Sequence, residues 1–197
     1  SEFVGCLDAD SYVAPDTLKK IISRFTNPLI MAVTPSIKVW NPQNILEKIQ
    51  STEYTVGIFL RRMLASLNAI HVAPGPFSIF RRKVFATIGA YRNAYNTEDL
   101  EIALRMHKHH LRIENASDAF VYTSTPKTVR ALVKQRVRWI SGFLYNVRDY
   151  RGMIFKKRYG NIGMFTLPAG ILSVISICYL AGYSVVQAIK YIAEKFV

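Results

Sequence analysis

Two acidic side chains separated by one residue lie near the start of the chain, in Asp8-Ala9-Asp10. The apolar run from Phe3 to Leu7 before them is typical of a buried strand, so we expect both acids at its carboxyl end. Ligands of open α/β sheets gather at such strand ends. Because carboxylates and phosphate oxygens together bind Mg²⁺ or Mn²⁺, Asp8 and Asp10 are candidate metal ligands. An isolated match of this kind also fits an ordinary loop start or helix cap.

A second acidic group, Thr97-Glu98-Asp99, comes at the start of a predicted helix. Thr97 can cap that helix, and the helix dipole favours acids in the first turn, so capping alone would explain all three residues. The functional alternative makes Asp99 a general base that takes a proton from a hydroxyl group. An exposed aspartate is a weak base at neutral pH, so this role requires a desolvated site.

The third group, Gln135-Arg136-Val137-Arg138-Trp139, lies within another predicted helix. Gln135, Arg138 and Trp139 are spaced i, i+3 and i+4, so they share one helix face. A guanidinium can bind phosphate oxygens, and an indole can stack on a sugar ring. The residues alone equally fit a basic amphipathic helix at a membrane surface, with Trp139 as its interface anchor.

The order of these groups, DxD, TED and QxxRW, followed by an uncharged segment, resembles that of the processive inverting family-two glycosyltransferases. This family includes cellulose, chitin, hyaluronan and bacterial poly-N-acetylglucosamine synthases. The resemblance covers nearly the whole chain, and the segment from Pro74 to Arg82 is also similar to the acceptor-side segment of the family. It implies an α/β fold, namely the C-terminal half of a GT-A (nucleotide-diphospho-sugar transferase) domain followed by a transmembrane helix.

The resemblance also implies a role for each matching residue. Asp8 and Asp10 would bind Mg²⁺ or Mn²⁺ and the donor diphosphate, and Asp99 would be the catalytic base. The diphosphate and the acceptor end of the glycan would be bound by Gln135, Arg138 and Trp139. Further acceptor-side residues would be Glu98, Gly75 and Pro76. The implied reaction is direct displacement with inversion, from a donor such as UDP-N-acetylglucosamine or UDP-glucose to a growing polysaccharide.

The chain departs from the family pattern before the DxD motif, where the family has its nucleotide-binding strands. Only seven residues precede Asp8, and the uracil-contacting acid of that region is not among them. We therefore expect a C-terminal fragment of the catalytic domain that is inactive alone. The family has several membrane helices that form a glycan channel. Since one candidate is visible here, we expect further membrane domains or subunits as partners.

The elements that must position these residues alternate between strands and helices, which predicts an α/β layered architecture. Strands are predicted over residues 3–7, 29–40, 77–80 and 119–123. Helices are predicted over residues 15–25, 42–67, 82–88, 97–111 and 126–146. We assign residues 1–150 to the partial GT-A domain, 151–161 to a basic juxtamembrane segment and 162–189 to the transmembrane helix.

Charge and apolar content predict a membrane partner. Lys and Arg total 26 against 13 acids, a net charge of +13, which indicates an anionic partner. Ten of these basic residues lie between Lys127 and Arg158, directly before the uncharged stretch from Ile162 to Ala188. As a helix this stretch extends ~40 Å, more than the ~30 Å hydrocarbon core, and the flanking charges orient the preceding domain to the cytosol, at the cell membrane. A buried helix of a soluble domain is the alternative.

Other residues carry weaker signals. We expect no disulfide between Cys6, in the first strand, and Cys178, in the uncharged stretch. The three histidines at 107, 109 and 110 lack the spacing of metal ligands, and we assign His71 to packing or a loop. Three aromatic residues are assigned to the core: Tyr54, Phe59 and Phe77.

Two rival functions stay open at this point: a non-processive transferase that makes a glycolipid, and a non-enzymatic anchor whose basic patch binds anionic lipid. We do not expect nucleic-acid binding, because no recognised module is present and the basic residues cluster beside the uncharged stretch.

Overall fold

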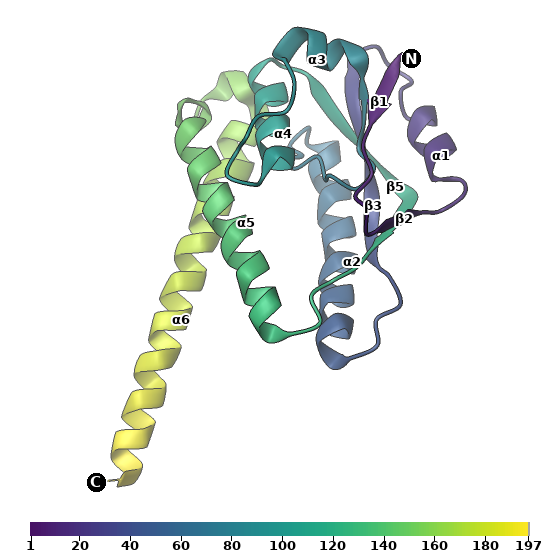
Figure 1. Cartoon of the computed structure of the whole chain (residues 1–197). Helices are drawn as coiled ribbons and strands as arrows, with labels where there is room; N and C mark the ends of the chain where they lie inside the picture. Colours follow the sequence, from purple (N-terminus) through teal and green to yellow (C-terminus); the bar gives the residue numbers. More distant parts are fainter. Residues whose placement is uncertain (197) are drawn as a thin grey trace.

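A mixed β-sheet forms the centre of the computed structural model, which describes residues 1–196 (Figure 1). Within these residues the strand order is β1-β4-β3-β5-β2. The strands are β1 (Phe3–Gly5), β2 (Ser11–Val13), β3 (Ile30–Val39), β4 (Ile79–Arg81) and β5 (Arg112–Thr123). Only β3 and β5 run parallel, and the other neighbouring strands of the described sheet are antiparallel.

Helices cover both faces of the sheet. They are α1 (Thr17–Ser23), α2 (Ile45–Ser66), α3 (Arg82–Ile88), α4 (Glu98–Lys108), α5 (Val129–Asp149) and α6 (Leu167–Phe196). Two 3-10 turns, Arg151–Met153 and Lys157–Tyr159, and a π-helical turn, Ile162–Thr166, connect α5 to α6. Since successive side chains of a strand point to opposite faces, Ala32 of β3 packs in the core with α2, α3 and α4, whereas Val33 packs in the core beneath α1.

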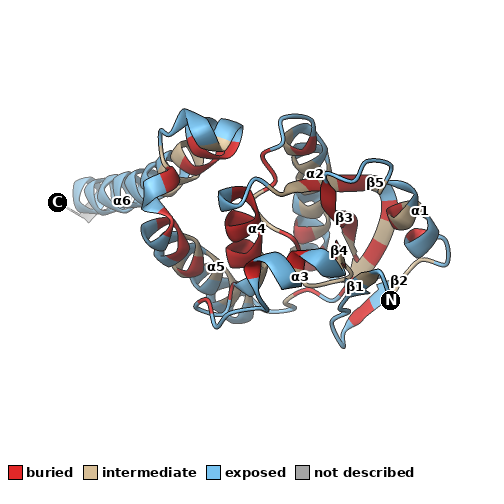
Figure 2. Cartoon of the chain, turned by 90° about the horizontal axis from the view of Figure 1, so that it is seen from above, coloured by how far each residue is buried: buried red, intermediate tan, exposed pale blue. Residues whose placement is uncertain are grey.

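Helix α4 lies between the sheet and the last two helices, and Figure 2 shows it almost wholly buried. Its Ile102 and Met106 pack in the sheet core, while Leu100 and Leu104 pack in a separate cluster with Leu167 at the start of α6. This second cluster holds the base of α6 on the domain. The TED segment at the start of α4 is therefore fixed from both sides.

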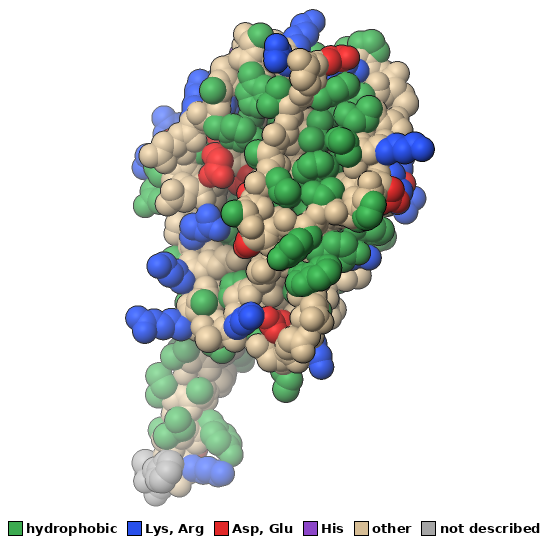
Figure 3. Space-filling view, turned by 45° about the vertical axis from the view of Figure 1, so that its right-hand side comes forward, with side chains coloured by type: hydrophobic (Ala, Val, Ile, Leu, Met, Phe, Trp, Pro, Cys, Tyr) green, Lys and Arg blue, Asp and Glu red, His purple; other side chains and the backbone are tan. Residues whose placement is uncertain are grey.

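Beyond this base α6 leaves the domain. Ile162 and Leu167 are fully buried, but from Leu172 onward nearly all large apolar side chains of the helix are exposed. Figure 3 shows apolar side chains along the part of α6 that extends below the domain. The helical stretch Ile162–Lys195 has 34 residues and contains an 18-residue window with a mean hydropathy of 1.9. In the described part of the chain it alone is long and apolar enough to cross a membrane. Length and composition agree with the predicted span, whose first residues pack against the domain.

The prediction of a buried first strand was wrong. Strand β1 lies at the edge of the described sheet with β4 as its neighbour, and Gly5 and Cys6 are exposed. An apolar composition alone does not distinguish an edge strand from a central one. Cys6 and Cys178 are both free, as expected.

Two strand segments were missed. β2 has only three residues, and the first half of β5 reads as polar because it contains Arg112, Glu114 and Asn115. The side chain of Asn115 is buried by pairing rather than by hydrophobicity, since its Nδ2 donates a hydrogen bond to the Thr34 carbonyl across 3.0 Å.

Candidate functional site

One cavity of about 670 Å³ lies among the strand ends, α2, α4 and α5, and the three sequence motifs meet in it. Every site residue predicted from the sequence lines this cavity: Asp8, Asp10, Gly75, Pro76, Glu98, Asp99, Gln135, Arg138 and Trp139. The convergence of residues far apart in the sequence argues against a chance match of three short patterns.

The two acids of the DxD motif lie on the turn between β1 and β2. The amide of Ser11 donates to the carbonyl of Asp8 across 3.0 Å, and Ser11 then pairs with Thr123 of β5. Partial burial raises the pKa of Asp8, and the negative charges of Asp10 and Glu98 raise it further. This concentration of negative charge suits a cation.

The donor set also suits a metal ion shared with a ligand. Within residues 1–196 no three His, Cys, Asp or Glu side chains converge as a ready-made metal site. Asp8 and Asp10 offer two carboxylates, which is the protein share usual for Mg²⁺ completed by phosphate oxygens and water. Of the histidines, His107 is buried with Nε2 2.7 Å from the Ile70 carbonyl oxygen, and His109 and His110 are exposed.

Asp99 occupies the first turn of α4. Thr97 is at the N-cap position, but its hydroxyl donates to the carbonyl of Ala94 across 2.8 Å and makes no side-chain cap bond. One carboxylate oxygen of Asp99 accepts a hydrogen bond from the Leu100 amide, also at 2.8 Å. Capping therefore does not account for the motif as a whole.

The surroundings of Asp99 make it a stronger base than an exposed aspartate. Burial raises the pKa of Asp99 to about 6, the Leu100 amide opposes this rise, and the charges of Glu98 and Arg138 add smaller effects of opposite sign. Since the requirement set by the sequence was a desolvated carboxylate, the burial of Asp99 meets it.

Helix α5 presents its QxxRW residues to the same cavity. Arg138 Nη1 donates to the Asn96 carbonyl across 3.1 Å, which holds the guanidinium beside the TED segment. Gln135 Oε1 is buried and has no hydrogen-bond partner in the described structure. Arg136 forms an ion pair with Glu53 of α2, and its guanidinium lies 4.6 Å from the centre of the Trp139 ring. The pair bridges α5 and α2 across the cavity.

The cavity residues that sequence reasoning missed include Tyr54, Arg61 and His71. Tyr54 and His71 were assigned to the core or to packing, and both line the cavity instead. Phe59, also assigned to the core, is 66 % exposed. No motif marks these positions. The one local signal is that Arg61 interrupts the apolar face of a long amphipathic helix.

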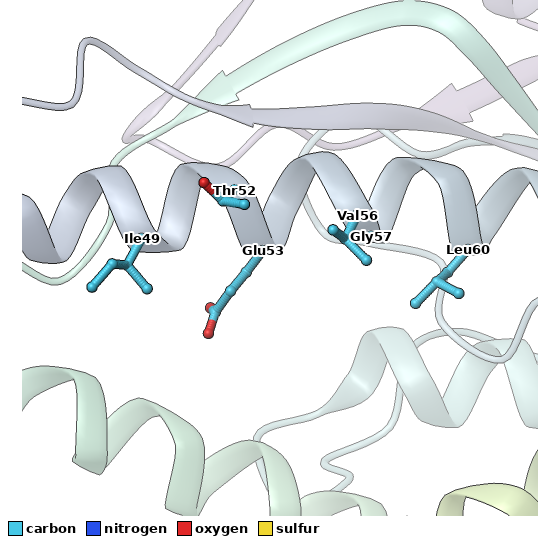
Figure 4. A pocket seen from close by; sticks show the side chains of 6 residues that line it. All are labelled: Ile49, Thr52, Glu53, Val56, Gly57 and Leu60. Atoms are coloured by element: carbon cyan, nitrogen blue, oxygen red, sulfur yellow. The ribbon is translucent and has the colours of Figure 1, made fainter.

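A second hollow of about 490 Å³ continues from the cavity along α2. Figure 4 shows the side chains of Ile49, Glu53 and Leu60 pointing from α2 away from the sheet and toward the space beside α5. Glu53, Gly57 and Leu60 line both hollows, so this groove is the open extension of the cavity.

Comparison with known proteins identifies the family to which the chain is similar. The sequence profile of the family described as glycosyl transferase family group 2 matches residues 3–193. The chain is 34% identical over 185 residues to a poly-beta-1,6-N-acetyl-D-glucosamine synthase of Staphylococcus epidermidis, covering 91% of this chain and 45% of the relative. It is 31% identical over 161 residues to the synthase of that name from Staphylococcus aureus strain COL, covering 80% of this chain and 39% of the relative.

A solved glycosyltransferase structure has a similar fold. The mannosyltransferase PcManGT from Pyrobaculum calidifontis, in complex with GDP-Man and Mn²⁺, superposes with a TM-score of 0.62 at 17% identity. The superposition covers 90% of this chain and 50% of that one, and it confirms the predicted α/β fold of the GT-A type. The chain spans about half the length of the relatives it matches.

Proposed function

Because the chain belongs to glycosyl transferase family group 2, we propose that it is the C-terminal part of the catalytic domain of a membrane-bound polysaccharide synthase. The enzyme transfers a sugar from a nucleotide-diphosphate donor to the end of a growing glycan, with inversion. The observation that carries this proposal is the single cavity in which Asp8, Asp10, Asp99 and Arg138 meet.

Asp99 is the catalytic base in this proposal. Its carboxylate takes the proton of the acceptor hydroxyl as the hydroxyl oxygen bonds to the anomeric carbon of the donor. The bond between that carbon and the nucleotide diphosphate breaks in the same step, and the diphosphate leaves. A pKa near 6 keeps most of Asp99 ionised at neutral pH and still makes it a better proton acceptor than an exposed aspartate.

The leaving diphosphate is held at the other side of the cavity. Arg138 binds its oxygens. Asp8 and Asp10 would hold Mg²⁺ or Mn²⁺, which would supply positive charge against that of the diphosphate. Trp139 and Gln135 contact the sugar end of the acceptor, and Glu98, Gly75 and Pro76 line the acceptor side. The pKa of Asp8, raised by burial and by neighbouring acids, supports a cation at this position.

The donor is UDP-N-acetylglucosamine in this proposal, ahead of UDP-glucose. The support is that the relatives are named poly-beta-1,6-N-acetyl-D-glucosamine synthases. The protein lies in the cell membrane through α6, with the catalytic domain in the cytosol. The exposed apolar length of α6 and the basic residues before it support this orientation.

The decisive experiment uses the full-length protein in membranes with radiolabelled UDP-N-acetylglucosamine and Mg²⁺ or Mn²⁺. We expect release of UDP and formation of a long polymer, and loss of both in Asp99→Asn. A short glycolipid product would instead support the non-processive alternative. If no nucleotide sugar is turned over, or if Asp99→Asn is as active as wild type, the enzymatic proposal fails and a lipid-binding anchor remains.

A further inference from the structure

The cavity has a polar wall that none of the three motifs supplies. Arg61 of α2 and His71 of the segment between α2 and β4 both line it. Arg61 Nη1 donates to the carbonyl of Pro35 at 3.2 Å, the one hydrogen bond that its guanidinium makes within residues 1–196. Burial lowers the pKa of Arg61 to about 10, and the negative charge of Asp99 partly restores it. A guanidinium with five N–H groups thus has donors to spare beside the proposed base.

His71 supplies an uncharged partner in the same wall. Burial, followed by the positive charges of Arg61 and His107, lowers the pKa of His71 to about 4, so the imidazole is neutral at physiological pH. Its Nδ1 is buried and has no hydrogen-bond partner in the described part of the chain. A buried polar atom without a hydrogen-bond partner is unfavourable, and a ligand hydroxyl would relieve this cost. A neutral imidazole can both donate to and accept from such hydroxyls.

The path of the chain places His71 at the base end of the cavity. Two residues after it, the amide of Ala73 donates to the backbone carbonyl of Asp99 across 3.0 Å. Two residues further on, Gly75 packs against Asp8, since a Cβ there would lie 3.1 Å from Asp8 Oδ1. The segment therefore runs from Asp99 toward the proposed metal and diphosphate side, with His71 preceding the Asp99 contact.

We propose that Arg61 and His71 form an acceptor-binding pair, which hydrogen-bonds hydroxyl groups of the terminal sugar of the glycan next to the hydroxyl that Asp99 deprotonates. This inference rests on the proposed function. The chemistry fits, because spare guanidinium donors and a neutral imidazole suit uncharged hydroxyls. The donor diphosphate is already provided for by Asp8, Asp10 and Arg138.

The test separates acceptor binding from donor binding in the full-length protein, with UDP-N-acetylglucosamine as donor and an N-acetylglucosamine oligosaccharide of defined length as acceptor. For His71→Ala we expect the KM for the oligosaccharide to rise roughly 3- to 10-fold, the loss of one net hydrogen bond, and the donor KM to change by less than about twofold. His71→Asn, which offers a side-chain nitrogen in place of Nδ1, should restore part of the acceptor affinity.

Arg61 requires a second variant because its side chain also holds Pro35. Arg61→Met removes both the structural and the proposed binding contact, whereas Arg61→Lys keeps a cation that can reach the Pro35 carbonyl. We expect both to raise the acceptor KM, Arg61→Lys by less. The matched controls are Arg62→Met and His109→Ala, since both side chains are exposed and do not line the cavity.

Three results would overturn the proposed acceptor-binding pair. They are equal effects on the donor and acceptor KM, an unchanged acceptor KM in His71→Ala, and no recovery of acceptor affinity in His71→Asn. Each of these results leaves the proposed function intact as long as wild type makes polymer and Asp99→Asn does not. Failure of wild type to turn over the donor instead removes the proposed function itself.

Discussion

Asn146 of α5 donates a hydrogen bond from Nδ2 to Thr97 Oγ1 across 3.0 Å, and both side chains are buried. The same Nδ2 donates to the carbonyl of Gly142 at 2.8 Å. This contact joins the helix that carries Arg138 to Thr97, two residues before Asp99. The position of the proposed base, Asp99, relative to Arg138 therefore depends on a contact between α4 and α5. We call this contact, formed by Thr97, Gly142 and Asn146, the α4–α5 joint.

Gly142 is the residue at this joint with no room for a side chain. A Cβ on Gly142 would lie 2.4 Å from Oγ1 and Cγ2 of Thr97, so Gly142→Ala must push α5 away from the start of α4. Overpacking of this kind costs about 1–3 kcal/mol. We expect kcat to fall and the Tm in detergent to drop, measured by sugar transfer and a thermal shift assay. Gly152→Ala is the matched control, because a Cβ there meets nothing within 4 Å; equal behaviour of the two variants would contradict the joint.

Mild acid should inactivate the enzyme by protonating the proposed base, Asp99. Since the pKa of Asp99 is about 6, we expect kcat/KM to fall as pH drops from 7.5 through 6, with a slope of about one proton. An aspartate with an ordinary pKa would keep full activity down to about pH 5. The pH profile of polymer formation at fixed donor concentration tests this, and an acid limb below pH 5 would argue against Asp99 as the base.

The raised pKa of Asp99 should make the folded chain less stable at higher pH, whereas it makes the enzyme more active there. The pKa of Asp99 is about 6 in the folded chain and about 4 in the unfolded chain, so the folded state binds more protons between these values. Stability should therefore fall as pH rises from 4 to 6. Above pH 6 the buried charge costs about 3 kcal/mol. We expect Asp99→Asn to raise the Tm by a few degrees at pH 7.5 and to abolish transfer; a lower Tm would contradict the burial of a charged carboxylate.

The ion pair inside α4 should matter far more than a surface pair of the same spacing. Arg105 and Glu101 are buried and 2.9 Å apart, and the hydroxyl of Tyr150 donates to the other carboxylate oxygen of Glu101 at 2.5 Å. Removing one partner leaves a buried charge, so we expect Arg105→Met to cost about 3–5 kcal/mol. Lys20→Met breaks the exposed i,i+4 pair with Asp16 and should lower the stability far less, because solvent screens an exposed pair. Thermal denaturation in detergent compares the two.

Helix α6 should insert into a bilayer. We expect a reporter protein whose one hydrophobic segment is residues 162–197 to integrate into microsomal membranes. Glycosylation sites placed before and after the segment report which side of the membrane each end reaches. Leu180→Arg near the middle of the exposed part should oppose insertion by about 2.5–3.5 kcal/mol. Lys190→Arg, which keeps the charge near the end, is the control. Equal insertion of the Leu180 variant and the wild-type segment would argue for a helix that packs on protein instead.

Much of the fold could be read along the chain. The helix predicted over residues 97–111 corresponds to α4, and the strand predicted over residues 77–80 overlaps β4. The polar first half of β5 could not be read in this way, because Asn115 is buried through hydrogen bonds to Thr34 rather than through apolar contacts.

By itself, the sequence determined the order of the main elements other than β2, the three motifs and the uncharged helix, since residue type and periodicity are local properties. Only the tertiary structure decided that Asp8, Asp99 and Arg138 share one cavity, that Asp99 is desolvated, and that β1 is an exposed edge. It also brought Arg61 and His71 to the wall beside Asp99, which no spacing could indicate. Burial and electrostatic coupling depend on which distant segments pack together, and that is set by the whole fold.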